Sequence, residues 1–230
     1  MNVTTAHQNH LIAALSKDEH DHVLSLSEVV ELAAGTVLYE DDQEIVRVYF
    51  PLNCVLSSIC IFESGHSAEM ATIGCEGMLS VTAVLGTMRV IGRNIVQVPG
   101  ACLVMSINAF QQAQEALPAF REVVNAYAHA LLGQIMQTVA CNALHSGEQR
   151  CAKWLLMTDD RANGEPFQLK QEFLAAMLGV NRITVSGIAN SLQQTGLISY
   201  SRGTISVLDR AGLEEVSCDC YPRIRKRFTP

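Results

Sequence analysis

The segment from Gln171 to Ile198, QEFLAAMLGVNRITVSGIANSLQQTGLI, places the tightest constraint on how this chain folds. Apolar residues recur in it at helical spacing in two runs. Gly179 ends the first run, and the second begins after Asn181. Glycine readily adopts the backbone conformation of a tight turn, which a residue with a Cβ resists. The spacing therefore predicts two short helices joined by a tight turn, a helix-turn-helix.

The residues after the second predicted helix alternate as strands do. Residues 197–200 and 204–208 flank Ser201-Arg202-Gly203, which is a hairpin signal. A helix-turn-helix followed by a hairpin is a winged helix. Two-helix segments are commonly plain core. Here the polar outward face of the second helix and the hairpin favour contact with DNA, and that face carries Arg182, Thr184, Ser186 and Asn190.

Composition and charge agree with a regulatory domain joined to a DNA-binding one. The chain has 230 residues, of which 49% are hydrophobic and 17% charged, enough for one large or two small domains with a sizeable core. Residues 1–145 carry 5 Lys and Arg against 14 Asp and Glu, net −9, whereas residues 146–230 carry 11 against 9, net +2. This asymmetry places the phosphate-facing surface in the second part, where the modest net charge favours specific or dimer-dependent binding.

The sequence carries no sign of a membrane or export. It has no apolar run of about 18 residues, the length that a membrane-spanning helix needs. The amino terminus, MNVTTAHQNH, lacks the basic and then apolar order of a signal peptide. We expect a cytoplasmic protein without membrane contact.

The eight cysteines form no CxxC pair, and most lie inside apolar patterns. In a cytosolic chain they are interpreted as small buried thiols. Cys218 and Cys220 offer two neighbouring thiolates, but no histidine or third cysteine lies near them in sequence. We therefore predict no metal site, and the role of this pair is left open.

The front of the chain changes from helical to strand periodicity. Residues 10–26 predict one or two short helices with Ser16 as the N-cap. Residues 29–107 then form short β-branched and apolar segments punctuated by turns, which is typical of a sandwich, barrel or jelly roll. The predicted strands are 46–50, 55–62, 68–73, 95–98 and 102–107.

Residues 110–143 predict one or two helices that Pro118 interrupts. The apolar stripe after Pro118 is wide enough to face both its own β domain and a partner helix, so it predicts a dimer; burial within one subunit is the alternative. The expected dimerisation residues are Tyr127, Leu131, Ile135 and Val139. Beyond them we expect a helix over 148–158, a polar loop over 159–166, a short helix over 209–215 and a basic solvated tail.

Together these parts resemble the Crp/Fnr superfamily of bacterial transcription regulators. The resemblance covers nearly the whole chain and is most specific in LGVNRITVSGIANSLQQTGLISYSRGTISVLD. It implies an α+β protein with a double-stranded β-helix (jelly-roll) sensor domain of the cyclic-nucleotide-binding type over residues 1–117. A dimerisation helix over 118–145 and a winged helix-turn-helix over 146–230 follow. CNALHSGEQRCAKWLL and CDCY resemble a less characterised branch.

In that family the second helix enters the major groove. The resemblance places Arg182 where a family arginine reads guanine. The next position, commonly acidic in the cAMP-responsive members, is Ile183 here, which suits contact with a thymine methyl. A later arginine position is Gly187 here, so the operator should differ from that of the cAMP-responsive members. Phosphate contacts fall on Lys170, Gln171, Thr184 and Arg202, with Ser186 on the same face.

The β domain departs from the cyclic-nucleotide motif. Gly77-Met78 stands where the family has Gly-Glu, and the later strand, IGRNIV, offers Arg93 and Asn94 without the family serine. We take these four as the candidate effector site and expect cAMP not to bind. No cysteine precedes Cys54, so we also expect no iron-sulfur cluster of the oxygen-sensing kind. Haem ligands by residue type alone are His66, Cys75 and His129.

The resulting hypothesis is a homodimeric regulator that binds a near-palindromic operator with half-sites about 34 Å apart. An unidentified signal at the β domain would act through the long helix, and the resemblance implies RNA polymerase as a further partner. The alternative is a ligand-binding sensor whose winged helix contacts protein. No catalytic motif appears, so we expect no enzyme. The effector, the operator and the direction of regulation are left open.

Overall fold

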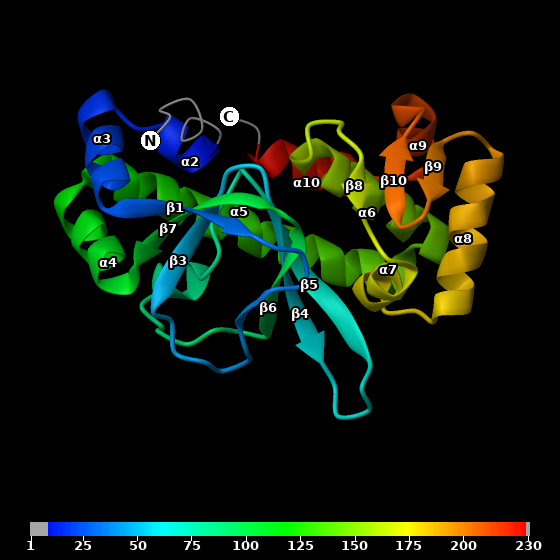
Figure 1. Cartoon of the computed structure of the whole chain (residues 1–230), viewed down its shortest axis with the longest axis horizontal. Helices are drawn as coiled ribbons and strands as arrows, with labels where there is room; N and C mark the ends of the chain where they lie inside the picture. The colour runs from blue at the N-terminus through cyan, green and yellow to red at the C-terminus, as the bar shows by residue number, and fades with distance from the viewer. Residues whose placement is uncertain (1–8, 229–230) are drawn as a thin grey trace. The chain divides into compact units, whose positions relative to one another are not determined.

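A computed structural model describes residues 9–228 of the chain (Figure 1). The expectation that no signal peptide is present concerns MNVTTAHQNH, whose first eight residues lie outside the described residues. By its contacts the chain divides into two compact units. The first comprises the residues up to Ser58 with Thr72–Leu132, and the second comprises Ile59–Ala71 with Gly133–Pro230. The functional limits after residues 117 and 145 stay a prediction.

The first unit begins with two short helices and continues as antiparallel β structure. Ser16 caps the second helix, because its hydroxyl oxygen accepts a hydrogen bond from the Glu19 amide at 3.4 Å, as predicted. The elements from residue 10 to residue 106 are α2 (His10–Ala13), α3 (Lys17–Ser25), β1 (Ser27–Leu32), β2 (Val37–Tyr39), β3 (Arg47–Pro51), β4 (Val55–Ile61), β5 (Ser67–Ile73), the 3-10 turn η1 (Val81–Ala83), β6 (Arg93–Val98) and β7 (Gly100–Ser106). The end of β4 and most of β5 belong to the second unit.

Strand β7 forms the centre of one sheet. It pairs antiparallel with β1, where Leu32 lies opposite Gly100, and with β3, where Arg47 lies opposite Ser106. Its apolar residues are almost fully buried, so the strand is part of the core on both faces. The second sheet has the order β2-β6-β4-β5. The predicted β domain is thus confirmed, and its sheets are antiparallel. Strands β1 and β2 were not among the predicted strands, and the three residues of β2 offer too short an alternation.

The long helix α5 (Pro118–Leu144) follows α4 (Ile107–Ala116). Pro118 fits the first helical position because the amide hydrogen that proline lacks has no partner there. The Glu19 carboxylate accepts a hydrogen bond from the free Phe120 amide at 2.9 Å, which anchors the start of the helix. The predicted break at Pro118 is therefore a boundary between two helices.

The second unit contains the predicted winged helix-turn-helix, which is confirmed. Its elements are α6 (Gly147–Arg161), β8 (Phe167–Gln168), α7 (Gln171–Leu178), α8 (Arg182–Gln194), β9 (Ile198–Ser201), β10 (Thr204–Val207), α9 (Arg210–Val216) and α10 (Cys220–Phe228). The small sheet has the order β8-β10-β9. Strand β8 was not predicted, because two residues carry no periodic signal.

The basic end of the chain is helical. Residues 220–228 form helix α10 and bury Tyr221 and Ile224, which was not predicted, whereas the basic side chains of Arg223, Arg225, Lys226 and Arg227 are exposed, as predicted. Arg223 pairs with Asp219 at 2.9 Å. Within residues 9–228, no helix is both long and apolar enough to cross a membrane.

Candidate functional site

The turn between α7 and α8 fixes how the second helix begins. Gly179 ends α7 with φ +63°, a left-handed conformation that glycine adopts without strain. The side-chain oxygen of Asn181 then accepts hydrogen bonds from Thr184, from its amide at 2.8 Å and from its hydroxyl at 3.0 Å. This N-cap satisfies a free amide of the first turn and holds the Thr184 side chain beside it.

The outward face of α8 is open. Ile183 is 86% exposed, which is unusual for a large apolar side chain, and Arg182 beside it is exposed as well. At Gly187, apart from the two neighbouring residues and the backbone of α8 itself, no heavy atom of the described chain lies within 4 Å of where a Cβ would stand. Because Gly187 has no side chain, the middle of this face does not project, and a bulky surface can approach the helix backbone closely.

Arg182 is held only loosely. Its guanidinium lies 3.0 Å from the Glu172 carboxylate, and both side chains are about two-thirds exposed. Exposed ion pairs of this kind contribute about 0 to 1 kcal/mol. Arg182 can therefore leave Glu172 for a stronger acceptor at little cost.

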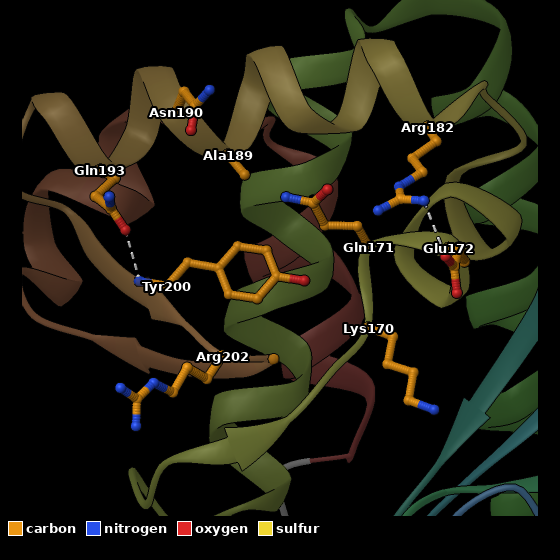
Figure 2. Close-up of a pocket in the computed structure, with 10 residues that line it drawn as sticks. Lys170, Gln171, Glu172, Arg182, Ala189, Asn190, Gln193, Tyr200 and Arg202 are labelled. Carbon is orange, nitrogen blue, oxygen red and sulfur yellow. Dashed lines mark hydrogen bonds and ion pairs between the residues drawn. The ribbon is translucent and has the colours of Figure 1, made fainter.

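A pocket of about 390 Å³ lies between the start of α7, helix α8 and the wing (Figure 2). Three cationic side chains and one carboxylate line it, so its balance is positive. Four predicted residues contribute, while Gln193 and Tyr200 were not predicted. The lining comprises Lys170, Gln171, Glu172, Arg182, Ala189, Asn190, Gln193, Tyr200, Arg202 and Gly203.

Tyr200 holds the wing against the helices. Its amide donates a hydrogen bond to the Gln193 side chain at 2.7 Å, and its hydroxyl donates one to the Leu169 carbonyl at 2.7 Å. Burial raises the pKa of the Tyr200 phenol, which keeps the hydroxyl a donor at neutral pH. An aromatic at this position of a hairpin is also an ordinary strand residue, so nothing specific in the sequence signals this role.

The turn of the wing places Arg202 at its tip. Arg202 has φ +51° and Gly203 φ +80°, so both central residues adopt positive φ, as two-residue hairpins favour. Ser186, which was also predicted to face DNA, donates instead to Gln171 at 2.8 Å and to the Arg182 carbonyl at 3.0 Å. Of the seven predicted residues, Lys170, Gln171, Arg182 and Arg202 line the pocket, Ser186 borders it, and Ile183 and Thr184 lie outside its lining.

The candidate effector residues of the first unit are not arranged as an open anion site. A Cβ at Gly77 would come within 2.2 Å of the Tyr127 ring, and Met78 is fully buried. Arg93 makes a two-point contact with Glu40, at 2.7 and 3.0 Å. Asn94 is buried and donates to the Gly92 carbonyl at 3.0 Å. An anion at Arg93 would have to displace the Glu40 carboxylate.

The predicted dimerisation residues divide into two groups. Tyr127 and Leu131 are buried within one chain, so they are not available to a partner. Ile135 is half-buried and Val139 is 67% exposed. The exposed apolar residues of α5 are instead Leu132, Met136, Val139 and Leu144. The residues predicted from the sequence therefore lie partly on the side of α5 that faces the core, because periodicity alone does not say which side of a wide apolar stripe faces inward.

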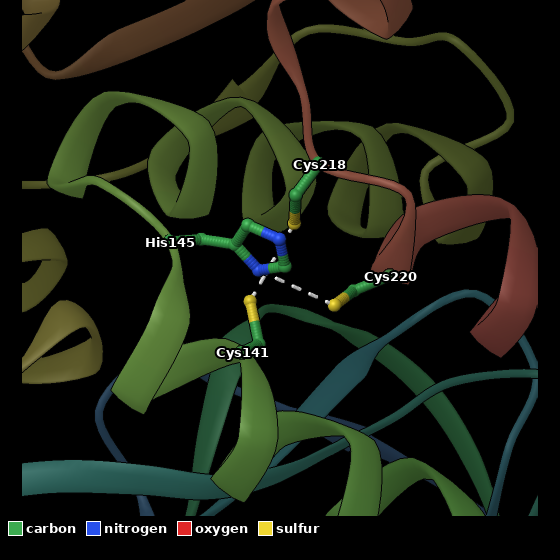
Figure 3. A group of neighbouring side chains, drawn as sticks. All are labelled: Cys141, His145, Cys218 and Cys220. Carbon is green, nitrogen blue, oxygen red and sulfur yellow. Dashed lines mark hydrogen bonds between the residues drawn. The ribbon is translucent and has the colours of Figure 1, made fainter.

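Four side chains of types that can bind metal ions lie together in the second unit, although they come from two segments distant in sequence (Figure 3). They are Cys141, His145, Cys218 and Cys220. The prediction of no metal site rested on the lack of a histidine or third cysteine nearby in sequence, and the fold supplies both from the end of α5. The one signal in the sequence was the four-residue spacing of Cys141 and His145, which places both side chains on the same face of a helix.

Comparison with known proteins agrees with this architecture. Residues 149–216 match the family described as the Crp-like helix-turn-helix domain. A cyclic AMP receptor protein of Thermus thermophilus is 32% identical over 75 residues, which cover 33% of this chain and 35% of that protein. The matched segment thus spans about a third of the length of this relative.

Solved structures share the fold over most of the chain. FixK2 from Bradyrhizobium japonicum has a TM-score of 0.68 at 14% identity and covers 84% of this chain and 98% of its own. The c-di-GMP responsive global regulator CLP of Xanthomonas campestris has a TM-score of 0.67 at 12% identity, with 84% and 99% covered.

An antiparallel β domain, a long helix and a winged helix-turn-helix define a fold that the chain shares with these solved structures. Within it, residues 149–216 match the Crp-like helix-turn-helix domain family.

Proposed function

We propose that this protein is a homodimeric, sequence-specific DNA-binding transcription regulator whose β domain responds to a signal. The observation that carries the proposal is the exposed face of α8 next to a positively lined pocket, which Lys170, Arg182 and Arg202 supply from three separate elements. A helix end and a wing that present cations side by side suit a major groove and its flanking phosphates.

In this proposal Arg182 is the main base-reading residue. It stands in the first turn of α8, the part of a recognition helix that contacts base edges. Its guanidinium can form two hydrogen bonds to guanine, and the exposed Ile183 next to it suits a thymine methyl. Lys170 and Arg202 contact phosphates, and Gly187 lets the backbone of α8 come close to the groove.

Dimerisation is proposed through the exposed stripe of α5. Leu132, Met136 and Val139 follow each other at intervals of four and three residues, the spacing of a coiled-coil seam, and each is more than half exposed. Ala143 continues the series and is exposed as well. A second copy of the same helix is the partner that this self-complementary stripe suits, and it would pair two recognition helices on a near-palindromic operator.

The signal at the β domain is proposed not to be cAMP. The Tyr127 ring covers Gly77, and the Glu40 carboxylate engages Arg93, so the two positions that grip the nucleotide in cAMP-binding relatives are both occupied by the chain itself. Helix α5 contributes to both compact units and carries Tyr127, which makes it the proposed route of communication. RNA polymerase is the proposed further partner.

Selection from random double-stranded DNA by the purified full-length chain tests the proposal. We expect enrichment of a near-palindromic sequence, and an affinity that falls steeply with salt because counterions are released from the phosphates. Binding of the enriched sequence is then measured by fluorescence anisotropy at several salt concentrations. Absence of any binding to DNA at low salt would contradict the proposal and favour a winged helix that contacts protein.

A further inference from the structure

Two segments distant in sequence bring four metal-binding side chains to one point of the second unit. Cys141 and His145 lie one helical turn apart at the end of α5, where the His145 amide donates to the Cys141 carbonyl at 3.0 Å. Cys218 and Cys220 lie at the junction between α9 and α10. All four potential ligand atoms are within 4.8 Å of one another. Figure 3 shows the three sulfurs and the imidazole converging.

The separations between the four atoms suit one tetrahedral ion. The Sγ atoms of Cys141 and Cys218 are 3.5 Å apart, and Cys220 Sγ is 3.5 Å from His145 Nδ1. Zinc binds sulfur at about 2.3 Å and nitrogen at about 2.0 Å, so the edges of its tetrahedron measure roughly 3.5 to 3.8 Å. A disulfide would need a separation of about 2.05 Å. A 4Fe–4S cluster binds each cysteine through a different iron, and a 2Fe–2S cluster binds its ligands in two pairs on two irons, so both require wider spacing across the set.

Neighbouring groups orient these side chains as they do in metal sites. His145 Nε2 lies 3.5 Å from the Asp219 carboxylate, which leaves Nδ1 directed at the cysteines. Zinc-binding histidines commonly have such a carboxylate at the other ring nitrogen. The side-chain amide of Gln137 donates to Cys220 Sγ at 3.1 Å, the kind of contact that stabilises a thiolate.

Burial and charge also suit a dication. Cys141, Cys218 and Cys220 are each at most 3% exposed, so three thiolates without a cation would be costly there. The buried Lys153 is close enough for its charge to act on Cys141. Three thiolates, a neutral imidazole and a dication leave one negative charge, which the ammonium of the buried Lys153 balances.

We propose that Cys141, His145, Cys218 and Cys220 bind one Zn²⁺ ion as a closed, structural site. The four ligands fill the tetrahedron and leave no position for a substrate. The ion joins the end of α5 to the start of α10, and so fastens the helix that enters the winged-helix unit to the last helix of that unit. This role does not depend on DNA binding.

Metal content of the full-length chain tests the site directly. The protein is expressed with zinc in the medium and freed of any affinity tag. After dialysis against metal-free buffer that contains a reductant, its metal content is measured by inductively coupled plasma mass spectrometry. We expect about one zinc per chain and no stoichiometric iron. X-ray absorption at the zinc edge should give three sulfur ligands at about 2.3 Å and one nitrogen at about 2.0 Å.

Matched variants separate ligand loss from unfolding. Cys218→Ser and Cys220→Ser should lose most of the zinc, whereas His145→Cys should keep it because thiolate is an equally good ligand. Cys151→Ser is the control, since Cys151 is a buried cysteine of the same unit outside the cluster, and it should keep one zinc. Circular dichroism establishes whether each variant is folded. If Cys218→Ser does not fold, cobalt(II) is added to the zinc-free parent protein as a substitute experiment. We then expect a strong absorption band from thiolate-to-cobalt charge transfer.

Three results would overturn the proposal. The first is parent protein that holds no stoichiometric zinc and takes up neither zinc nor cobalt at the cluster. The second is full retention of zinc in folded Cys218→Ser and Cys220→Ser. The third is a disulfide between Cys141 and Cys218 in protein purified under reducing conditions, which would make the pair a redox element instead.

Discussion

Arg182 and Glu172 form an ion pair of 3.0 Å between the first turns of the two helices of the helix-turn-helix. The pair places a carboxylate beside the residue that we propose reads a base, and both side chains are largely exposed. Glu172 therefore competes with DNA for Arg182, although weakly, and adds a negative charge to a surface that meets phosphates. The relationship makes Glu172 a residue that limits affinity.

Replacement Glu172→Gln should tighten binding to the selected operator. The exposed pair is worth about 0 to 1 kcal/mol, so its loss should lower the Kd by up to roughly fivefold. Fluorescence anisotropy at low salt measures the change. Glu215→Gln removes an equal charge from an exposed position outside the pocket and serves as the control. Weaker binding by Glu172→Gln would instead make Glu172 a DNA-contacting residue.

Arg182→Ala and Lys170→Ala should weaken DNA binding in different ways. Loss of a bidentate base contact costs about 1 to 3 kcal/mol and relaxes preference at one base position. Loss of a phosphate contact weakens all sequences alike and reduces the salt slope by about 1. Selection with each variant and titration against salt distinguish the two. An unchanged consensus for Arg182→Ala would remove the proposed base contact.

The helix-turn-helix was predictable from sequence because its signals are local. Gly179 and Asn181 mark the turn within three residues, and the apolar spacing on either side sets both helices. The same holds for the wing, where Gly203 fixes the hairpin. Helix α10 was missed because its arginines resemble a solvated tail, while only its packing identifies Tyr221 and Ile224 as core.

The cluster of cysteines could not be predicted because its parts are joined only by the fold. Cys141 and Cys218 are 77 positions apart in sequence and 3.5 Å apart in space. A comparable limit affected α5, where a wide apolar stripe left two orientations open. Burial of Leu131 and exposure of Leu132, adjacent residues, decide between them.

Met136→Asp should convert the dimer to a monomer. Met136 is 65% exposed in the middle of the stripe. In the dimer, the aspartates introduced at this position in the two copies would be buried against each other, and their negative charges would repel. Analytical ultracentrifugation measures the mass. Ala126→Asp adds the same charge to an exposed position of α5 off the stripe and should leave the dimer intact. A dimer that persists in Met136→Asp would place the interface elsewhere.

Glu69→Ala should lower the stability of the second unit. The indole of Trp154 donates a buried hydrogen bond to Glu69 at 2.7 Å, and an unsatisfied buried donor costs about 1 to 3 kcal/mol. Glu69→Gln keeps an acceptor and should lose less. Thermal unfolding followed by circular dichroism gives the difference, and fluorescence of Trp154, the single tryptophan, reports the local change. Equal losses for both variants would show that charge, not the hydrogen bond, matters there.

Cys151 should resist alkylation in the native protein. Burial raises the pKa of its thiol to about 12, with a further contribution from the Glu148 charge, so at pH 8 only about one molecule in ten thousand carries the reactive thiolate. Iodoacetamide at pH 8 followed by peptide mass mapping measures modification. Cys60, which is partly exposed, should react first, and both should react after unfolding in urea. Rapid modification of native Cys151 would mean that helix α6 opens on the time scale of the reaction, because a thiol that is fully buried in the closed state gives the reagent no access.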